Sequence, residues 1–272
     1  MTRWAPNAEV QSADGTRITL YRQEASQAPK ADVLLVHGLA DHMGRYSHVA
    51  EAFAVAGFRV TGVDLRGNGL SDGKRGHVMA WQELVDDLAA AAQSLPTPPV
   101  VVAHSMGGLV ALDYARAHPV PALILSAPLL KPKVAIPAWK KAAARLLNRL
   151  LPAVPMGNEL DAKAVSRHPE VIHSYDTDPL VYHTTTPRWY REMLNAGLRN
   201  CDGASGMTTP LLCMWGSGEK IVDPEAIAQL CSEWGGPVDT RVWDGLYHEI
   251  FNEPERAEVL KMTTTWLSQR FS

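Results

Sequence analysis

The sequence has few cysteines, and none of them is arranged as a metal site or a disulfide framework. Cys201, Cys213 and Cys231 are the only three among 272 residues, and their spacing is not that of metal ligands. Because an odd number cannot pair completely, we expect free thiols in a reducing compartment. The pattern argues against a zinc module and against a small, secreted domain held by disulfides.

A large excess of one charge and a long apolar run are also missing. The formal net charge is -3 and the sequence pI is about 6.4, whereas a nucleic-acid-binding domain normally has a basic face and a pI well above neutral. No run approaches the roughly 20 apolar residues of a membrane-spanning helix. Residues 1–15 contain no apolar segment after Arg3 that would suit a secretory signal. We therefore expect a cytoplasmic protein that binds no nucleic acid.

The apolar residues follow two patterns, one typical of strands and one typical of helices, in successive segments of the chain. They make up 46% of the chain, enough for one large domain with a substantial core. Short apolar runs alternate with helical patterns, which predicts a mostly parallel sheet covered by helices on both faces. Alternation near residue 16 predicts an antiparallel strand, and the polar run 238–245 an edge strand. The other predicted strands are 32–38, 58–64, 99–105, 122–127 and 210–216; the predicted helices are 47–56, 80–94, 107–117, 224–234 and 255–269.

Residues 129–205 interrupt this alternation. They contain no convincing strand and two amphipathic helical patterns, at 139–151 and around 189–194. A connection of this length is better explained as an inserted subdomain than as a loop. It follows the fifth core strand, so it would cover the edge of the sheet where open α/β sheets bind ligands. We predict an α/β core of residues 1–128 and 206–272, with a helical cap at 129–205.

Ser105 lies where a predicted strand runs directly into a helix. A sharp strand-to-helix turn needs small residues two positions before and after the serine, and Ala103 and Gly107 occupy these positions. The turn would place the Ser105 hydroxyl at the helix N-terminus, where free N–H groups and the helix dipole stabilise developing negative charge. The pattern predicts a nucleophilic serine; the alternative is a serine that caps the helix.

The loop after the strand 32–38 is the expected source of an oxyanion donor. In a fold with such a serine, this loop supplies one N–H group and the residue after the nucleophile supplies the other. The two donors would be the amides of Leu39 and Met106, and Gly38 would let the backbone approach the substrate carbonyl. We expect His37 to brace the loop.

A histidine and two acidic residues follow in the order serine, acid, histidine. His248 comes just after the last predicted strand, which is where a base would be delivered. Glu219 lies in the turn after the preceding strand. Asp223 competes with it, but Asp223 followed by Pro224 is a typical helix start. We therefore favour Glu219 as the acid and leave Asp223 as the alternative.

Taken together, these residues resemble the monoacylglycerol lipase family, also described as the lysophospholipase or serine aminopeptidase-like group of α/β-hydrolases. The resemblance covers nearly the whole chain. Seven matching segments occur in order: HGLADHMGRY (37–46), DLRGNGLSDGKRGHV (64–78), AHSMGG (103–108), LSAPLL (125–130), DPL (178–180), WGSGEKIVDP (215–224) and GLYHEIFNEPER (245–256).

The resemblance implies an α/β-hydrolase fold and a catalytic triad of Ser105, Glu219 and His248. It implies Leu39 and Met106 as oxyanion donors. It also implies a cap lined by apolar residues that receives an acyl chain, and it requires no metal or organic cofactor.

The resemblance further implies that Asp41 and Arg45 lie near the part of the pocket that binds the alcohol. Three residues depart from the family pattern. Ala103 replaces a glycine, Asn68 replaces a histidine, and Glu219 replaces an aspartate. The last change could lower activity by shifting the histidine, or it could be a working variant.

The expected activity is hydrolysis of a carboxylic ester, first of all a monoacylglycerol. A lysophospholipid or a broad range of small esters are the alternatives. A peptidase would need an acidic cluster for the substrate's amino terminus, and none is evident in the sequence. A weakly catalytic ligand-binding protein on the same fold is the alternative from another class. The sequence does not determine the oligomeric state.

The helix predicted at 139–151 could also touch a membrane surface transiently. Its basic side would face anionic headgroups while its leucines face the core or the lipid. The basic residues are Lys140, Lys141, Arg145 and Arg149.

Overall fold

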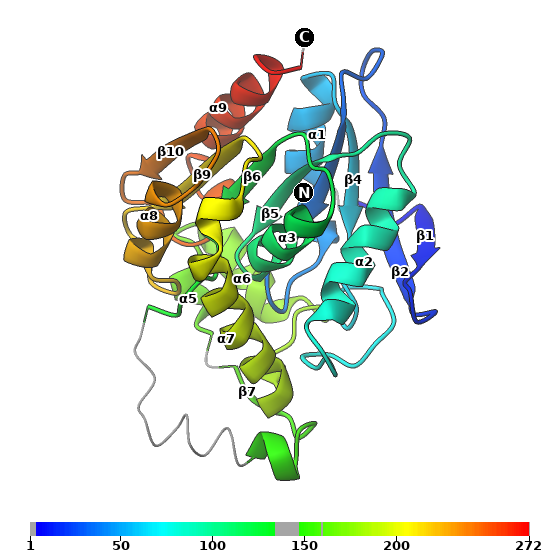
Figure 1. Ribbon diagram of the computed structural model, residues 1–272, viewed down its shortest axis with the longest axis vertical. Coiled ribbons are helices and arrows are strands. Elements are labelled where there is room, and N and C mark those ends of the chain that lie inside the picture. The colour runs from blue at the N-terminus through cyan, green and yellow to red at the C-terminus, as the bar shows by residue number, and fades with distance from the viewer. Residues whose placement is uncertain (1–3, 134–146, 159, 272) are drawn as a thin grey trace.

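An eight-stranded sheet runs through the centre of the molecule. The structure is a computed structural model that describes residues 4–133, 147–158 and 160–271. The strand order is β1-β2-β4-β3-β5-β6-β9-β10. Only β2 pairs antiparallel, with β1 on one side and β4 on the other, and the remaining pairs are parallel (Figure 1). The predicted mostly parallel sheet is confirmed.

Burial explains the composition of the strands. The central strands β3 (Asp32–Val36) and β5 (Val100–His104) are buried at every position, which is why they form continuous apolar runs. The edge strand β10 (Val238–Trp243) is exposed at all positions except its last, as its polar sequence predicted. The other long strands are β2 (Arg17–Gln23), β4 (Arg59–Val63), β6 (Leu123–Ser126) and β9 (Leu211–Gly216).

One strand of the sheet was not predicted. The strand β1 (Ala8–Gln11) pairs with β2 at the other edge of the sheet. It has only four residues and none is fully buried, so its apolar pattern is too short and too weak to be recognised.

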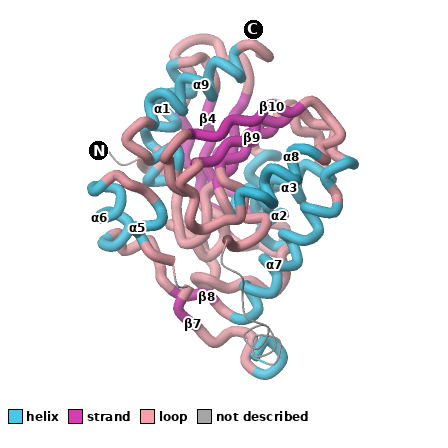
Figure 2. The backbone as a smooth tube through the Cα atoms, turned by 90° about the vertical axis from the view of Figure 1, so that its left-hand side faces the viewer, coloured by secondary structure: helices cyan, strands magenta, loops and turns pink. Residues whose placement is uncertain are grey.

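Helices cover both faces of the sheet. On one face, α1 (Ser47–Val55) and α9 (Arg256–Ser268) contribute to one apolar core. On the opposite face, a second core includes residues of three core helices. These are α2 (Gln82–Gln93), α3 (Met106–Ala117) and α8 (Pro224–Ser232). The predicted arrangement of layers is therefore confirmed (Figures 1 and 2).

The chain between β6 and β9 includes the predicted cap and contains several helices among its described residues. Figure 2 shows α5 and α6 on one side of this region and α7 on the other. The helix α7 confirms the pattern around 189–194. The helices are α5 (Ala162–Val165), α6 (Pro169–Thr177) and α7 (Pro187–Asp202).

The structure differs from one expectation for the predicted cap and describes only part of another. The strands β7 (Met156–Gly157) and β8 (Thr184–Thr185) form a short antiparallel pair, so the prediction of no strand was wrong. Two residues per strand are too few to show alternation. Of the helix predicted at 139–151, residues 147–150 are helical; residues 134–146, with Lys140, Lys141 and Arg145, lie outside the described residues. The boundaries of the cap stay a prediction.

Polar contacts join the predicted cap to the core. The Arg167 guanidinium donates to the buried Glu253 carboxylate at 2.7 Å. The Tyr182 hydroxyl donates to Oδ1 of Asn68 at 3.0 Å, while the Asn68 amide donates to the carbonyl of Arg66. Asn68, where the family pattern has histidine, thus ties the two parts together. Within the described residues, no helix is long and apolar enough to cross a membrane.

Candidate active site

Ser105 occupies the turn between β5 and α3 in a strained backbone conformation. Its φ is 52° and its ψ is -118°, a region that L-residues rarely adopt. Gly107 is required by close packing, since a Cβ there would come within 2.4 Å of the His37 carbonyl oxygen. Ala103 is buried, and its methyl group is accommodated. The short side chains around Ser105 therefore allow the turn that presents its hydroxyl.

A chain of hydrogen bonds connects Ser105, His248 and Glu219. The distance from Ser105 Oγ to His248 Nε2 is 2.9 Å, and that from His248 Nδ1 to Glu219 Oε2 is 2.8 Å. All three residues are buried. With the proton on Nδ1, the imidazole donates to the carboxylate and can accept the serine proton. This arrangement can activate a hydroxyl nucleophile.

The structure brings Glu219, and not Asp223, to the histidine. The second carboxylate oxygen of Glu219, Oε1, accepts hydrogen bonds from the N–H groups of Lys220 and Ile221 at 2.8 and 2.7 Å. These contacts hold the side chain against its own loop. Asp223 instead caps α8, where its Oδ1 accepts the N–H of Glu225 at 3.0 Å.

Burial and pairing act in opposite directions on the ionisable members of this chain. Burial by itself would raise the pKa of Glu219, but the nearby His248 and the N–H groups of Ile221 and Val222 together outweigh it, so the pKa is lowered. Burial would lower the pKa of His248, but the Glu219 charge and hydrogen bond raise it above 6.5. Each member of the pair therefore stabilises the charged form of the other, and the carboxylate of Glu219 stabilises the imidazolium form of His248.

His104 is a neighbour that the sequence interpretation missed. Its ring centroid lies 4.7 Å from that of His248, and its Nδ1 is 3.1 Å from the Ser126 hydroxyl. Burial lowers the pKa of His104 to about 3, so the ring stays neutral and packs against the His248 imidazole. Its position directly before Ser105, at the strand-to-helix turn, was the available sequence signal.

The two expected oxyanion donors lie on the loop and helix that flank Ser105. Leu39 lines the same cavity as Ser105. Met106 is the first residue of α3, so its N–H has no carbonyl one turn earlier within the helix. His37 is fully buried, and its Nε2 accepts the N–H of Leu65 at 3.1 Å. This contact braces the loop, as expected.

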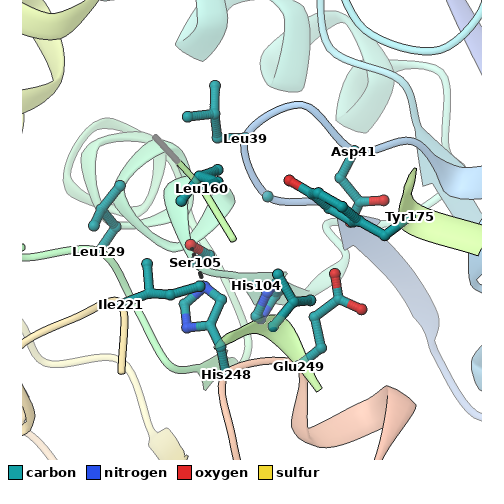
Figure 3. A pocket seen from close by; sticks show the side chains of 12 residues that line it. Leu39, Asp41, His104, Ser105, Leu129, Leu160, Tyr175, Ile221, His248 and Glu249 are labelled. Atoms are coloured by element: carbon teal, nitrogen blue, oxygen red, sulfur yellow. Dashed lines mark hydrogen bonds between the residues drawn. The ribbon is translucent and has the colours of Figure 1, made fainter. Parts of the chain in front are cut away.

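A cavity of about 40 Å³ opens at Ser105 and has two chemically different sides (Figure 3). The apolar side is formed by Leu39, Leu129, Leu160 and Ile221. The polar side is formed by Asp41, Tyr175 and Glu249. Leu160 and Tyr175 come from the predicted cap, so that segment helps to enclose the serine.

The polar side contains an ion-pair network around Arg45. Arg45 donates to Asp41 at 2.7 Å and to both oxygens of Glu249 at 2.9 and 2.8 Å. Of the two residues expected near the alcohol, Asp41 lines the cavity. Arg45 lies behind it and lines a second cavity of about 300 Å³. Glu249 and Tyr175 were missed: the position of Glu249 directly after His248 was the available sequence signal, whereas only the fold brings Tyr175 to Ser105.

The network also revises one step of the sequence interpretation. No acidic cluster that could bind an amino terminus was evident, yet Asp41 and Glu249 form a carboxylate pair beside Ser105. The two residues are separated by most of the chain, so no spacing could reveal the pair. Among residues 4–133, 147–158 and 160–271, no group of three or more His, Cys, Asp or Glu is placed to hold a metal ion.

A family model, curated relatives and a solved structure all place this chain among the same group of proteins. The model of the family described as serine aminopeptidase, S33, matches residues 27–255. A monoacylglycerol lipase of Mycolicibacterium smegmatis is 38% identical over 263 residues, which covers 93% of either chain. A monoglyceride lipase of Rattus norvegicus is 31% identical over 96% of this chain and 90% of that protein. The crystal structure of a Paleococcus ferrophilus monoacylglycerol lipase superposes with a TM-score of 0.85 at 31% identity, covering 92% of this chain and 99% of that one.

Proposed function

This chain belongs to the serine aminopeptidase S33 family of α/β-hydrolases, and we propose that it is a serine hydrolase that cleaves the ester bond of monoacylglycerols. The observation that carries the proposal is the hydrogen-bonded chain from Glu219 through His248 to Ser105. It ends in a cavity with one apolar and one polar side, which matches an ester of a fatty acid with a small polyol.

The first half of the proposed reaction is acylation of Ser105. His248 takes the hydroxyl proton as Oγ forms a bond to the ester carbonyl carbon. The carbonyl oxygen becomes an oxyanion that accepts the amides of Leu39 and Met106. When the tetrahedral intermediate collapses, the bond to the alcohol oxygen breaks and His248 returns its proton to that oxygen. Glu219 orients the ring and stabilises its charged form.

The second half repeats these steps with water. His248 takes a proton from a water molecule as the water oxygen bonds to the acyl carbon. The bond to Oγ then breaks, the proton returns to Ser105, and the fatty acid is released. Every group in the cycle belongs to the chain or to the substrate, so the mechanism consumes no cofactor.

The choice of substrate rests on the two sides of the cavity and on the relatives. The apolar side suits the first carbons of an acyl chain, and the polar side suits the hydroxyl groups of glycerol. Relatives named monoacylglycerol lipase support this choice. A relative named a phospholipase, in Bacillus subtilis, is 32% identical, which keeps lysophospholipids and smaller esters as alternatives.

The test is release of free fatty acid from 1-monooleoylglycerol, compared with oleoyl lysophosphatidylcholine and a short aryl ester. We expect the highest kcat/KM for the monoacylglycerol. A higher value for the lysophospholipid or the aryl ester would overturn the proposed substrate but retain the hydrolase. Tight binding of the monoacylglycerol without turnover would favour the binding-protein alternative.

The pH profile provides a separate prediction. His248 must be neutral to accept the serine proton, and the pairing with Glu219 raises its pKa above 6.5. The acid limb of kcat/KM for p-nitrophenyl acetate is therefore expected to be centred above pH 6.5, with activity lost as the pH falls through that value. Because Glu219→Gln removes the charge that raises this pKa, the limb should move to lower pH. A parent profile centred below 6.5 would contradict the assignment of His248.

One observation favours a second candidate, an aminopeptidase. The carboxylates of Asp41 and Glu249 beside Ser105 could attract a substrate's ammonium group. However, Glu249 already accepts two hydrogen bonds from Arg45 and one from Asn252, so few of its lone pairs are free. Faster hydrolysis of aminoacyl p-nitroanilides than of monoacylglycerols would select this candidate.

The proposed setting is the cytoplasm, with transient contact to a lipid surface. The three cysteines are free thiols, as expected in a reducing compartment. Leu150 and Leu151, next to the exposed Arg149, are 65% and 56% exposed at the edge of the predicted cap. An apolar pair beside a cation suits an anionic bilayer surface.

A further inference from the structure

We propose that the polar side of the cavity admits neutral alcohols and rejects anionic ones, and that Glu249 is the residue that sets this specificity. The inference rests on the proposed function and extends it from the reaction to the leaving group. The cavity would accept an uncharged glycerol ester in preference to the same ester carrying a phosphate.

The first support is the charge of the network. Asp41 and Glu249 supply two carboxylates, and Arg45 supplies one guanidinium that binds both of them. The three side chains are at most 7% exposed, so solvent screens them little. Two negative charges against one positive charge leave the network with a net negative charge beside Ser105.

The second support is the absence of a compensating cation in the cavity wall. No lysine or arginine belongs to the described residues that line the cavity around Ser105. Arg256 lines the second cavity behind Arg45, together with Glu170 and Asp178. That neighbourhood therefore adds at least as much negative as positive charge. Among the lining residues that the structure describes, an anionic group in the catalytic cavity would find no lysine or arginine to pair with.

The third support is that the two carboxylates act on their neighbours in spite of Arg45. Burial raises the pKa of the Tyr175 hydroxyl, and Glu249 and Asp41 raise it further, whereas Arg45 opposes them less. The same two carboxylates add to the raised pKa of His248 after Glu219. The field in the cavity is therefore negative at both groups that flank the alcohol.

The geometry singles out Glu249 from the pair. Asp41 also accepts the hydroxyl of Tyr46 at 2.7 Å and the N–H of His42 at 2.8 Å, so it holds the loop together. Among the described residues, the carboxylate of Glu249 accepts hydrogen bonds from Arg45 and Asn252 alone. Glu249 also follows His248 directly, which places its charge near the oxygen that His248 protonates.

Tyr175 adds an uncharged contact that suits a polyol. Its ring lies beside Arg45 and its hydroxyl points into the cavity in Figure 3. The raised pKa keeps this hydroxyl protonated, so it can donate to or accept from a glycerol hydroxyl. A phosphate in the same place would gain one hydrogen bond but would face the net negative charge of the network in a medium of low dielectric constant.

The experiment compares 1-lauroylglycerol with 1-lauroylglycerol 3-phosphate, using the full chain and release of lauric acid. We expect the parent to prefer the neutral ester by about 100-fold in kcat/KM, the scale of like-charge repulsion at a buried site. Glu249→Gln preserves the shape and removes the charge, so it should reduce the preference by about tenfold. The readout is a ratio, which a uniform loss of active enzyme does not change.

Two control variants separate charge from structure. Glu249→Asp retains the charge and should keep most of the preference, while Glu258→Gln makes the same change on the exposed face of α9 and should leave it unaltered. A parent preference below about threefold, or a Glu249→Gln ratio equal to that of the parent, would overturn the inference alone. No release from either ester by the parent would overturn the proposed function, and this inference with it.

Discussion

Replacement of Ser105 by alanine is expected to abolish measurable hydrolysis of 1-monooleoylglycerol while the protein stays folded. The substitution removes the atom that bonds to the acyl carbon, and loss of a nucleophile of this type reduces kcat by about 10⁴ to 10⁶-fold. Alanine retains the Cβ and adds no bulk, so the strained turn at φ 52° is neither relieved nor crowded. The measurement is fatty acid release, together with thermal unfolding.

The control for this variant is Ser232→Ala. Ser232 is exposed at the end of α8, and its hydroxyl donates to the carbonyl of Gln229 within its own helix. Its replacement should leave hydrolysis within about twofold of the parent, as is usual for surface changes. Retained hydrolysis in a folded Ser105→Ala variant would show that another residue attacks the ester.

The second large effect is expected at the acid. Glu219→Gln should lower kcat by about 10³ to 10⁴-fold, because a neutral amide neither stabilises the imidazolium nor enforces the proton on Nδ1 of His248. Glu219→Asp keeps the charge but shortens the side chain, so the 2.8 Å contact to Nδ1 would lengthen. We expect a smaller loss for the aspartate variant, measured as kcat on 1-monooleoylglycerol.

Asp223→Asn is the matched control at the competing acid. Asparagine is as good a helix N-cap as aspartate, so α8 should stay capped and kcat should change by less than about threefold. If Asp223→Asn lost activity as Glu219→Gln is expected to, the assignment of Glu219 as the acid would have to be revised. An intact pH profile in Glu219→Gln would also contradict the role of this carboxylate.

The aspartate-to-glutamate departure has a local physical explanation. The longer side chain reaches His248 with one oxygen while the other is held by the N–H groups of Lys220 and Ile221. The loop around residue 219 thus accommodates the longer side chain of a glutamate. This geometry favours the interpretation of a working variant over that of a damaged triad.

Local patterns in the sequence determined the fold. The continuous valine and leucine runs of β3 and β5 predict strands because such runs are stable only when a sheet is buried on both faces. The short β1 and the pair β7 and β8 escaped prediction, because two to four residues carry no periodicity. Ser105 and His248 were also predicted from the sequence, because Ser105 directly follows β5 and His248 lies in the loop after β10.

Only the tertiary structure decided which side chains share the site. The choice between Glu219 and Asp223 depended on which carboxylate meets His248, and Arg45 contacts Glu249 across 204 positions of sequence. Tyr175, from the predicted cap, joined the cavity around Ser105 in the same way. Periodicity reports how each segment is buried but not which segments become neighbours, since that depends on strand order and on the placement of the cap. The charge beside Ser105, and with it the proposed choice of leaving group, is therefore a property of the fold.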